Sequence, residues 1–205
     1  MGKFTKIPEN AFQALQLDAG VLLNTFDPSD PDEPADEDII CATTGGIQIS
    51  CIPQFSDLAA DVDNAPNGIK EFVHLDSWNC TVAFTSLGTS VELLKLALGA
   101  ADSDSSTSKI APRRDLDQED FADLWWVGDR ADGGLVACKI YNALSTGGLS
   151  LQTGKNAKGQ ISVTLTGHVS LNEQDLMPME FYSLDPEDDD NTPGDDDNTQ
   201  TPSTP

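Results

Sequence analysis

The chain has 205 residues and carries 35 Asp and Glu against 11 Lys and Arg, which gives a formal net charge of −24 at pH 7. This length suits one domain with a substantial core. So large an acidic excess disfavours attraction to nucleic-acid phosphates or to anionic membranes, because both bind basic residues. No apolar run reaches the roughly 18 residues of a membrane-spanning helix, and the N-terminal segment lacks the apolar core of a signal peptide.

The first fifty residues predict one short helix followed by β-structure. Pro8, the apolar pair Phe12 and Leu15, and Gly20 predict a helix over residues 8–19. The expected elements after it are a strand over 21–26, a proline-rich acidic loop over 27–38, and a hairpin over 39–52 that turns at Thr44-Gly45-Gly46.

The middle of the chain combines turns, one strand and the clearest helix. Residues 53–70 are rich in turn residues, and the alternation over 72–85 predicts a half-buried strand. Residues 90–98 predict a helix, with Thr89 and Glu92 spaced as a capping box and Gly99 as the stop. A flexible loop is expected over 102–109.

The segment 121–151 predicts a β-meander with Gly-rich turns and contains the adjacent residues Trp125 and Trp126. Neighbouring side chains on a strand point to opposite faces, so one Trp can enter the core while the other needs a different cover. That cover is a helix or second sheet in a lone domain, and a neighbouring subunit in an assembly.

The strand expected over 161–170 alternates apolar residues with hydroxyl residues that include Thr164 and Thr166. One face therefore belongs to the core. The other is an ordinary solvent face or a surface toward a neighbour or an enclosed space. Trp125, Trp126, Thr164 and Thr166 are the candidate assembly-surface residues.

The C-terminal part divides into a closing edge segment over 177–182 and an acidic, low-complexity tail. The motif DDDNT occurs twice in this tail, which lacks the apolar residues needed to fold. We therefore expect one β domain over 1–184 and a disordered tail over 185–205.

Catalytic and metal-binding residue types form no recognisable constellation. His74 and His168 lie on expected strands without a converging nucleophile, and the acidic segments lack the residue spacing of a calcium loop. No enzyme activity, cofactor or metal site is predicted. The four cysteines form no C-x-x-C pair and are expected to be reduced thiols, although Cys41 and Cys51 flank an expected turn and could lie near one another.

The order of these landmarks resembles the major tail protein of long-tailed bacteriophages of Gram-positive hosts, over about residues 8–182. The residues that carry the resemblance are Ala19-Gly20-Val21-Leu22-Leu23, Phe26-Asp27-Pro28, Thr43-Thr44-Gly45-Gly46-Ile47, Asp63-Asn64-Ala65-Pro66, Trp78, Gly99-Ala100-Ala101-Asp102, Ile110-Ala111-Pro112-Arg113, Asp120 to Gly128, Asp132-Gly133-Gly134 and Thr146-Gly147-Gly148.

The resemblance implies a mainly β sandwich or barrel with a flanking α-helix, acting as a tail-tube subunit. Such subunits form hexameric rings that stack into a tube, contact tip, tape-measure and terminator proteins, and let phage DNA pass without specific binding. They are made in the host cytoplasm and end in the virion tail, with no membrane partner. Two alternatives stay open: a monomeric calcium- or glycan-binding β-sandwich module, and a capsid-decoration or head–tail joining protein.

Overall fold

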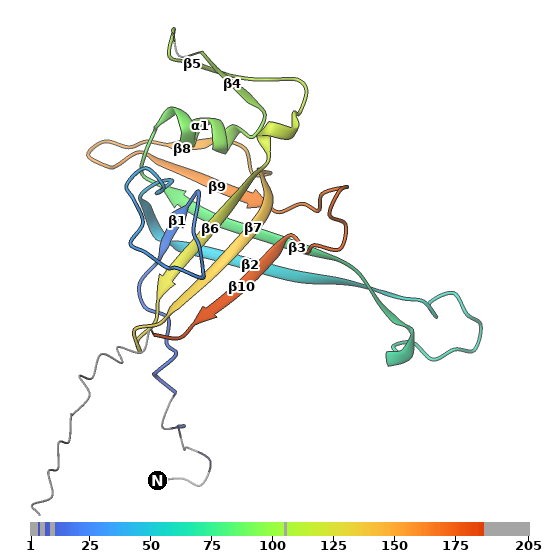
Figure 1. Ribbon diagram of the computed structural model, residues 1–205. Coiled ribbons are helices and arrows are strands. Elements are labelled where there is room, and N and C mark those ends of the chain that lie inside the picture. The colour runs from blue at the N-terminus through green and yellow to red at the C-terminus, as the bar shows by residue number, and fades with distance from the viewer. Residues whose placement is uncertain (1–3, 5–6, 9–10, 105, 187–205) are drawn as a thin grey trace, which may run out of the picture.

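The computed structural model describes residues 4, 7–8, 11–104 and 106–186, and this part of the chain is mainly antiparallel β-structure with one α-helix (Figure 1). The strands are β1 Val21–Leu23, β2 Thr43–Asp57, β3 Val73–Ser86, β4 Ala101–Asp104, β5 Lys109–Pro112, β6 Ala122–Asp129, β7 Leu135–Ser145, β8 Ser150–Gln152, β9 Gln160–Thr166 and β10 Met179–Leu184. The helices are α1 Val91–Leu98 and two 3₁₀ turns, η1 Lys70–Phe72 and η2 Gln118–Asp120. The mainly β fold class predicted from the sequence is confirmed.

Eight of these strands form one antiparallel sheet that folds into two layers. One layer contains β1, β6, β7 and β10, and the other contains β2, β3, β9 and β8. The layers are joined where the end of β7 pairs with β9 through Leu144 and Ser145. Strands β4 and β5 form a separate hairpin, which projects above α1 (Figure 1).

The main core lies between the two layers, and α1 closes one end of it. Its buried residues come from both layers and from the helix: Leu22, Cys80, Val82, Phe84, Leu93, Ala97, Leu124, Cys138, Ile140, Ala143, Ile161, Val163, Leu165 and Met179. Alternation therefore decides which side chains enter the core. On β9 the apolar residues are at most 1% exposed, as the sequence predicts for one face of this strand.

Helix α1 begins and ends with its own capping residues. The Ser90 hydroxyl accepts a hydrogen bond from the Leu93 backbone N–H at 3.2 Å, and Gly99 ends the helix with φ 76°. The predicted helix and its glycine stop are confirmed, but the cap is Ser90, and the expected Thr89–Glu92 capping box was wrong. Ser145 fastens the helix to β7 by donating to the Ala97 carbonyl at 2.8 Å.

The predicted helix over residues 8–19 is not present in the described part of that segment. Residues 11–14 form turns, and Gln16 bridges to Arg130 at the end of β6. Phe12 and Leu15 are 65% and 48% exposed, so the apolar face of such a helix would pack on nothing. An isolated helix of this length is marginal in water, which explains the outcome.

The predicted hairpin turn at Thr44-Gly45-Gly46 was also wrong. These glycines lie inside β2, at a shift in its pairing with β3 between Thr44 and Ile47. The sequence therefore placed a turn where the strand has a bulge. The actual partner of β2 is β3, and the connection between them lies at residues 58–72.

The remaining elements follow the sequence with small changes. Strands β6 and β7 form the predicted hairpin, but the third strand of the predicted meander was wrong, because β8 pairs with β9 and not with β7. Strand β10 pairs only with β7 among the described strands. The expected loop over 102–109 instead contributes to the β4–β5 hairpin, and the last long strand ends at Thr166. The predicted tail lies outside the described residues from 187 onward. Among those described, none of the helices has the length and apolarity to cross a membrane.

Candidate assembly surfaces

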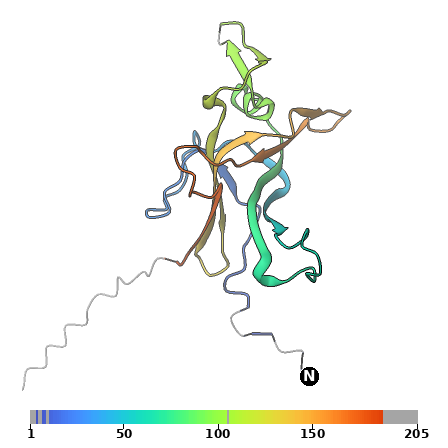
Figure 2. The same cartoon turned by 90° about the vertical axis from the view of Figure 1, so that its right-hand side faces the viewer.

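Half of the β2–β3 hairpin projects far beyond the two-layer body (Figures 1 and 2). The paired residues Cys51 and Cys80 mark the point where it leaves the core, because Cys80 is 1% exposed whereas Ile52 and Asn79, the next pair outward, are both exposed. We call residues 52–79 the arm. It comprises the outer parts of β2 and β3, the connection between them and η1.

One face of the arm continues the core-facing side of the two strands. Trp78 packs against the core cluster, and alternation places Phe55 on the same side of β2 as Cys51. On β3 this alternation would next bring Asp76 to that side. A register shift leaves Asp76 unpaired, and Leu75 pairs with Phe55 instead. The bulge therefore turns Asp76 away from this face and continues the face with Leu75; the acidic residue on this side is Asp57, opposite Val73 at the outer end of the strand pair.

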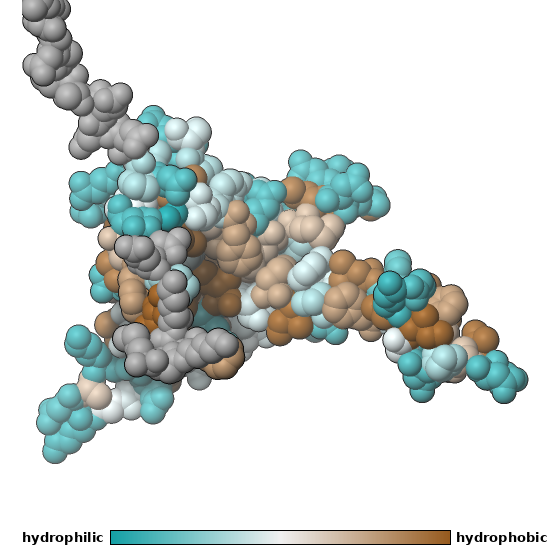
Figure 3. Space-filling model, turned by 90° about the horizontal axis from the view of Figure 1, so that it is seen from below, coloured by the Kyte–Doolittle hydropathy of each residue, from teal (hydrophilic) through white to brown (hydrophobic). Residues whose placement is uncertain are grey.

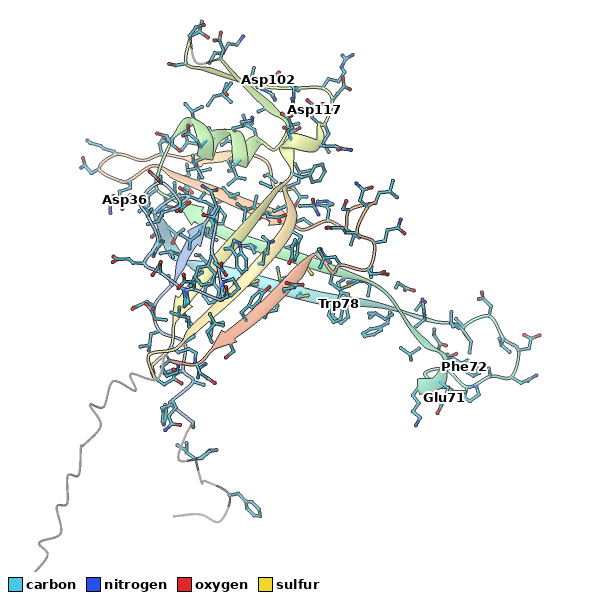
Figure 4. All side chains as sticks on the ribbon, viewed as in Figure 1. Asp36, Glu71, Phe72, Trp78, Asp102 and Asp117 are labelled. Atoms are coloured by element: carbon cyan, nitrogen blue, oxygen red, sulfur yellow. The ribbon has the colours of Figure 1, made fainter. Side chains whose placement is uncertain are left out.

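This face forms an apolar surface that is open to solvent. We call it the arm stripe and define it as Phe55, Val73, Leu75 and Trp78. Phe55 is 61% exposed, Val73 47% and Leu75 42%. Three further exposed apolar residues lie at the far end: Leu58, Val62 and Phe72. Figure 3 shows apolar residues along the projecting arm, and Figure 4 labels Phe72 at its end and Trp78 at its root.

The far end of the arm is held in place by backbone hydrogen bonds. The Asp57 carboxylate accepts from the backbone N–H of Ala59 at 2.9 Å and of Gly68 at 3.1 Å, and these bonds hold the pKa of Asp57 below its ordinary value of 3.8. Phe72 accepts at its carbonyl from the Leu58 N–H at 2.9 Å. The arm is thus an ordered hairpin that presents its apolar residues in a defined geometry.

The edge of β2 opposite β3 has no strand partner in the described part of the chain. Residues 43–52 of this edge contain no charged residue and no proline, the two features that natural proteins commonly use to block unwanted strand pairing. At the other end of the same layer lies the short strand β8, which pairs only with β9 among the described strands. The layer therefore has two unlike edges.

The outward face of this layer carries no charged side chain over three neighbouring strands. Pairing aligns Thr164 with Ala83 and Gln48, and Thr166 with Thr81 and Ser50. Thr146 adds a hydroxyl that lies 2.8 Å from that of Thr166. A shallow depression of about 420 Å³ on this face is lined in part by Gln48, Thr85, Ser162 and Thr164. The two threonines predicted from the sequence thus belong to one polar, uncharged surface.

Trp125 and Trp126 point to opposite faces of β6, as predicted, and both are covered largely within the subunit. Trp126 packs against the main core and donates to the Ala19 carbonyl at 2.9 Å. Trp125 is 7% exposed and contacts Phe26 at 5.4 Å and Tyr182 at 5.5 Å between ring centroids. Phe26, which lies between β1 and the acidic loop, and Tyr182 of β10 thus provide the second cover, and neither Trp ring offers much area to a neighbour.

A small polar cluster borders Trp125 on the same face. The Glu180 carboxylate accepts hydrogen bonds from the hydroxyls of Tyr141 at 2.8 Å and Tyr182 at 2.7 Å. Burial and the bond to Glu180 raise the pKa of Tyr141. Lys139 lies 4.2 Å from the Tyr141 ring centroid and pairs with Asp123 at 3.2 Å. The polar groups of this cluster are therefore paired with one another within the subunit.

The two histidines lie in separate places. His74 is exposed on the arm, whereas His168 packs on Phe121 at 5.3 Å with its Nδ1 3.1 Å from the Asn142 carbonyl oxygen. Within the described ranges, His, Cys, Asp and Glu form no group of three or more that could hold a metal ion. Asp27, in the acidic loop, accepts from both the hydroxyl and the N–H of Ser29, which lowers its pKa.

Sequence reasoning missed the arm as a functional surface. Residues 53–70 looked like turns because Asp and Asn separate their apolar residues. The available signal was the density of large apolar residues in that segment, namely Phe55, Leu58 and Val62. A solvated loop does not need them, so they indicated a surface to be covered.

No protein-family model and no curated protein matches this chain. Among solved structures, a chain described as "Crystal structure of Hcp protein" is similar to it at 14% sequence identity. The alignment covers 74% of this chain and 81% of that chain, with a TM-score of 0.30.

Proposed function

We propose that this chain is a non-enzymatic structural protein that assembles with copies of itself into stacked rings, as the tail-tube subunit of a long-tailed phage. The observation that carries the proposal is the arm stripe. Monomeric soluble proteins rarely leave the apolar face of a projecting hairpin uncovered, whereas such a surface is typical of an element that packs against another molecule.

The arm suits contacts between successive rings. It extends well outside the body, so its end reaches beyond the subunit's own layers (Figure 1). Phe55 and Phe72 supply aromatic side chains, a type enriched in protein interfaces, and Leu75 adds apolar area. A second copy of this chain is the proposed occupant, seated against the arm stripe.

The unlike edges of the β2–β8 layer suit contacts within a ring. A head-to-tail interface joins two different surfaces of identical subunits and closes when the rotation completes a circle. The open edge of β2 on one subunit and the β8 side of the next provide such a pair. Strand pairing across this contact would continue the layer around the ring. The hexameric number comes from the family resemblance.

The net charge of −24 is consistent with a channel that phage DNA crosses without adhering. Basic side chains would bind phosphates and retain the genome. The uncharged face that contains Thr164 and Thr166 is the proposed location of a neighbouring subunit or of the enclosed space. Assembly would take place in the host cytoplasm with tip, tape-measure and terminator proteins.

The test is negative-stain electron microscopy of the purified chain over a range of concentrations, with wild type and two variants. Wild type should form stacked rings or tubes, and the double variant Phe55→Ser/Leu75→Ser should abolish them because it removes the apolar stripe. The matched control is Leu171→Ser. Leu171 is an exposed apolar residue, 82% accessible, that lies outside the arm and outside the strands of the β2–β8 layer, so its variant should still assemble.

Tubes formed equally by the double variant would contradict the role of the arm. Wild-type subunits that stay monomeric at every concentration, and still do so after addition of a tail-tip complex, would contradict tube formation. Binding to capsids or to tube ends without polymerisation would instead favour a decoration or joining protein. Calcium-dependent melting would favour the calcium-binding module.

A further inference from the structure

Two cysteine thiols face each other where the arm leaves the body. Cys51 on β2 and Cys80 on β3 are direct cross-strand partners, and their sulfur atoms are 3.0 Å apart. A disulfide requires an S–S distance of about 2.05 Å and Cβ atoms about 3.5–4.5 Å apart, close to the spacing of directly opposed residues on paired strands. The two sulfurs therefore need to approach by only about 1 Å to bond.

The two thiols differ in their access to solvent. Cys80 is 1% exposed, whereas Cys51 is half-buried at the rim of the core. A small reagent in solution therefore reaches Cys51 first, and Cys80 can react only with what is attached to Cys51. The expectation that Cys41 could lie near Cys51 is replaced by this pairing. Cys41 instead hydrogen-bonds Ser86 at the other end of the strand pair.

We propose that Cys51 and Cys80 form a reversible redox pair that closes into a cross-strand disulfide at the root of the arm. The co-reactant is a small disulfide of the glutathione class. The Cys51 thiolate attacks one sulfur of this reagent, forms a mixed disulfide and releases one thiolate. The Cys80 thiolate then attacks the Cys51 sulfur and releases the second. Two cysteine thiols are thus oxidised by two electrons, the reagent is reduced to two thiols, and the protons of both cysteines go to the released thiolates.

The second step has a pH dependence set by burial. Burial raises the pKa of the Cys80 thiol to about 12, and only the thiolate is nucleophilic. Between pH 7 and 9 the thiolate fraction, and with it the rate of closure from the mixed disulfide, should rise about tenfold per pH unit. Closure is therefore slow at neutral pH even though the sulfurs lie in near contact.

The bond would act on the arm whatever the arm binds. It would join β2 to β3 covalently at the last pair that the core covers, so the outer residues 52–57 and 73–79 could no longer separate from their root. Free thiols persist in a reducing cytosol and disulfides in oxidising surroundings. The reduced arm would therefore belong to the interior of a cell and the clamped arm to its exterior.

The test incubates the folded wild-type chain, and a Cys41→Ser/Cys138→Ala variant that keeps only the pair, with oxidised glutathione at pH 7, 8 and 9. Free thiols are then alkylated, and the protein is digested with trypsin under non-reducing conditions. Cleavage after Lys70 separates Cys51 from Cys80, so the disulfide is detected as peptide 7–70 joined to peptide 71–95. Hydrogen exchange of the arm is measured before and after reduction.

We expect the joined peptides in both proteins, at a rate that rises about tenfold per pH unit, together with hydrogen exchange slowed at least twofold over 52–57 and 73–79. The variant Cys51→Ser should give no joined peptide. A mixed disulfide at Cys51 that never resolves would overturn the proposal. A joined peptide that appears only in denaturant would also overturn it. A disulfide between Cys51 and Cys138 would do the same, since Cys138 is a third thiol near enough to Cys51 for the two to interact electrostatically.

Discussion

The inner and outer halves of the β2–β3 hairpin have the same secondary structure and opposite surroundings. In the inner half, Val82 and Phe84 are at most 5% exposed beneath a second β-layer. In the outer half, Phe55 and Val73 lie on the same side of the strands and are 61% and 47% exposed. Hydrogen bonds therefore support most of the arm, whereas burial of apolar side chains supports the body.

The largest expected difference comes from removing a leucine side chain from each half of the molecule. Leu165→Ala in the body should lower the free energy of unfolding by about 2–5 kcal/mol. Leu165 is only 1% exposed, so removal of its side chain would leave a cavity in the core. Leu75→Ala on the arm should change it by less than about 0.5 kcal/mol. Chemical denaturation measures both. Equal losses would mean that the arm stripe is covered within the subunit.

A smaller difference should follow from two glycines with the same backbone geometry. Gly20 in the body has φ 69°, and an added Cβ would lie 2.5 Å from the Val127 carbonyl oxygen and 2.6 Å from Trp126 Nε1. Gly68 on the arm has φ 77°, and its Cβ would meet no atom within 4 Å. Gly20→Ala should therefore cost about 2–4 kcal/mol through strain and overpacking, against about 1 kcal/mol for Gly68→Ala. Thermal and chemical unfolding of the two variants measures both losses of stability, and their difference reports the crowding at Gly20. Equal losses of stability in the two variants would contradict the close packing around Gly20.

The smallest effect should be a local loosening of the arm in acid. The pKa of Asp57 lies below 3.8 because its carboxylate accepts two backbone hydrogen bonds, so its stabilising contribution is complete above about pH 4. That contribution is lost as the pH falls through the depressed pKa. The N–H of Gly68 should then exchange faster while the body amides stay protected, as hydrogen exchange can measure. Asp57→Ala should remove this pH dependence; its persistence would assign the loosening to another carboxylate.

The sequence was informative wherever local chemistry and burial act together. The alternation of β3 and β9, the stop of α1 at Gly99 and the opposite faces of Trp125 and Trp126 all follow from rules that hold along a single segment. These rules located most strands and the core side of β9. The candidate threonines also fell on the uncharged face.

The failures share a different cause. The expected N-terminal helix depended on Phe12 and Leu15 finding a partner surface, which local periodicity cannot establish. The glycines at 45 and 46 have the composition of a turn, but pairing with β3 makes them part of a bulge. Residues 53–57 have the composition of a turn region, but pairing with β3 makes them the outer part of β2. Each of these outcomes is decided by residues far away in the sequence.

The bulge at Asp76 has a consequence for what the chain is by itself. A single inserted residue exchanges the two sides of a strand. In β3 the inserted residue is Asp76, and as a result Leu75 takes the place opposite Phe55 that Asp76 would otherwise occupy. That side therefore stays apolar from the core through Trp78 to the Phe55–Leu75 pair, and the outermost pair places Val73 beside Asp57. The arm thus extends one side of the hydrophobic core beyond the body and leaves Phe55 61% and Leu75 42% exposed in the described chain. Under the proposed function, a second copy of the chain covers these side chains.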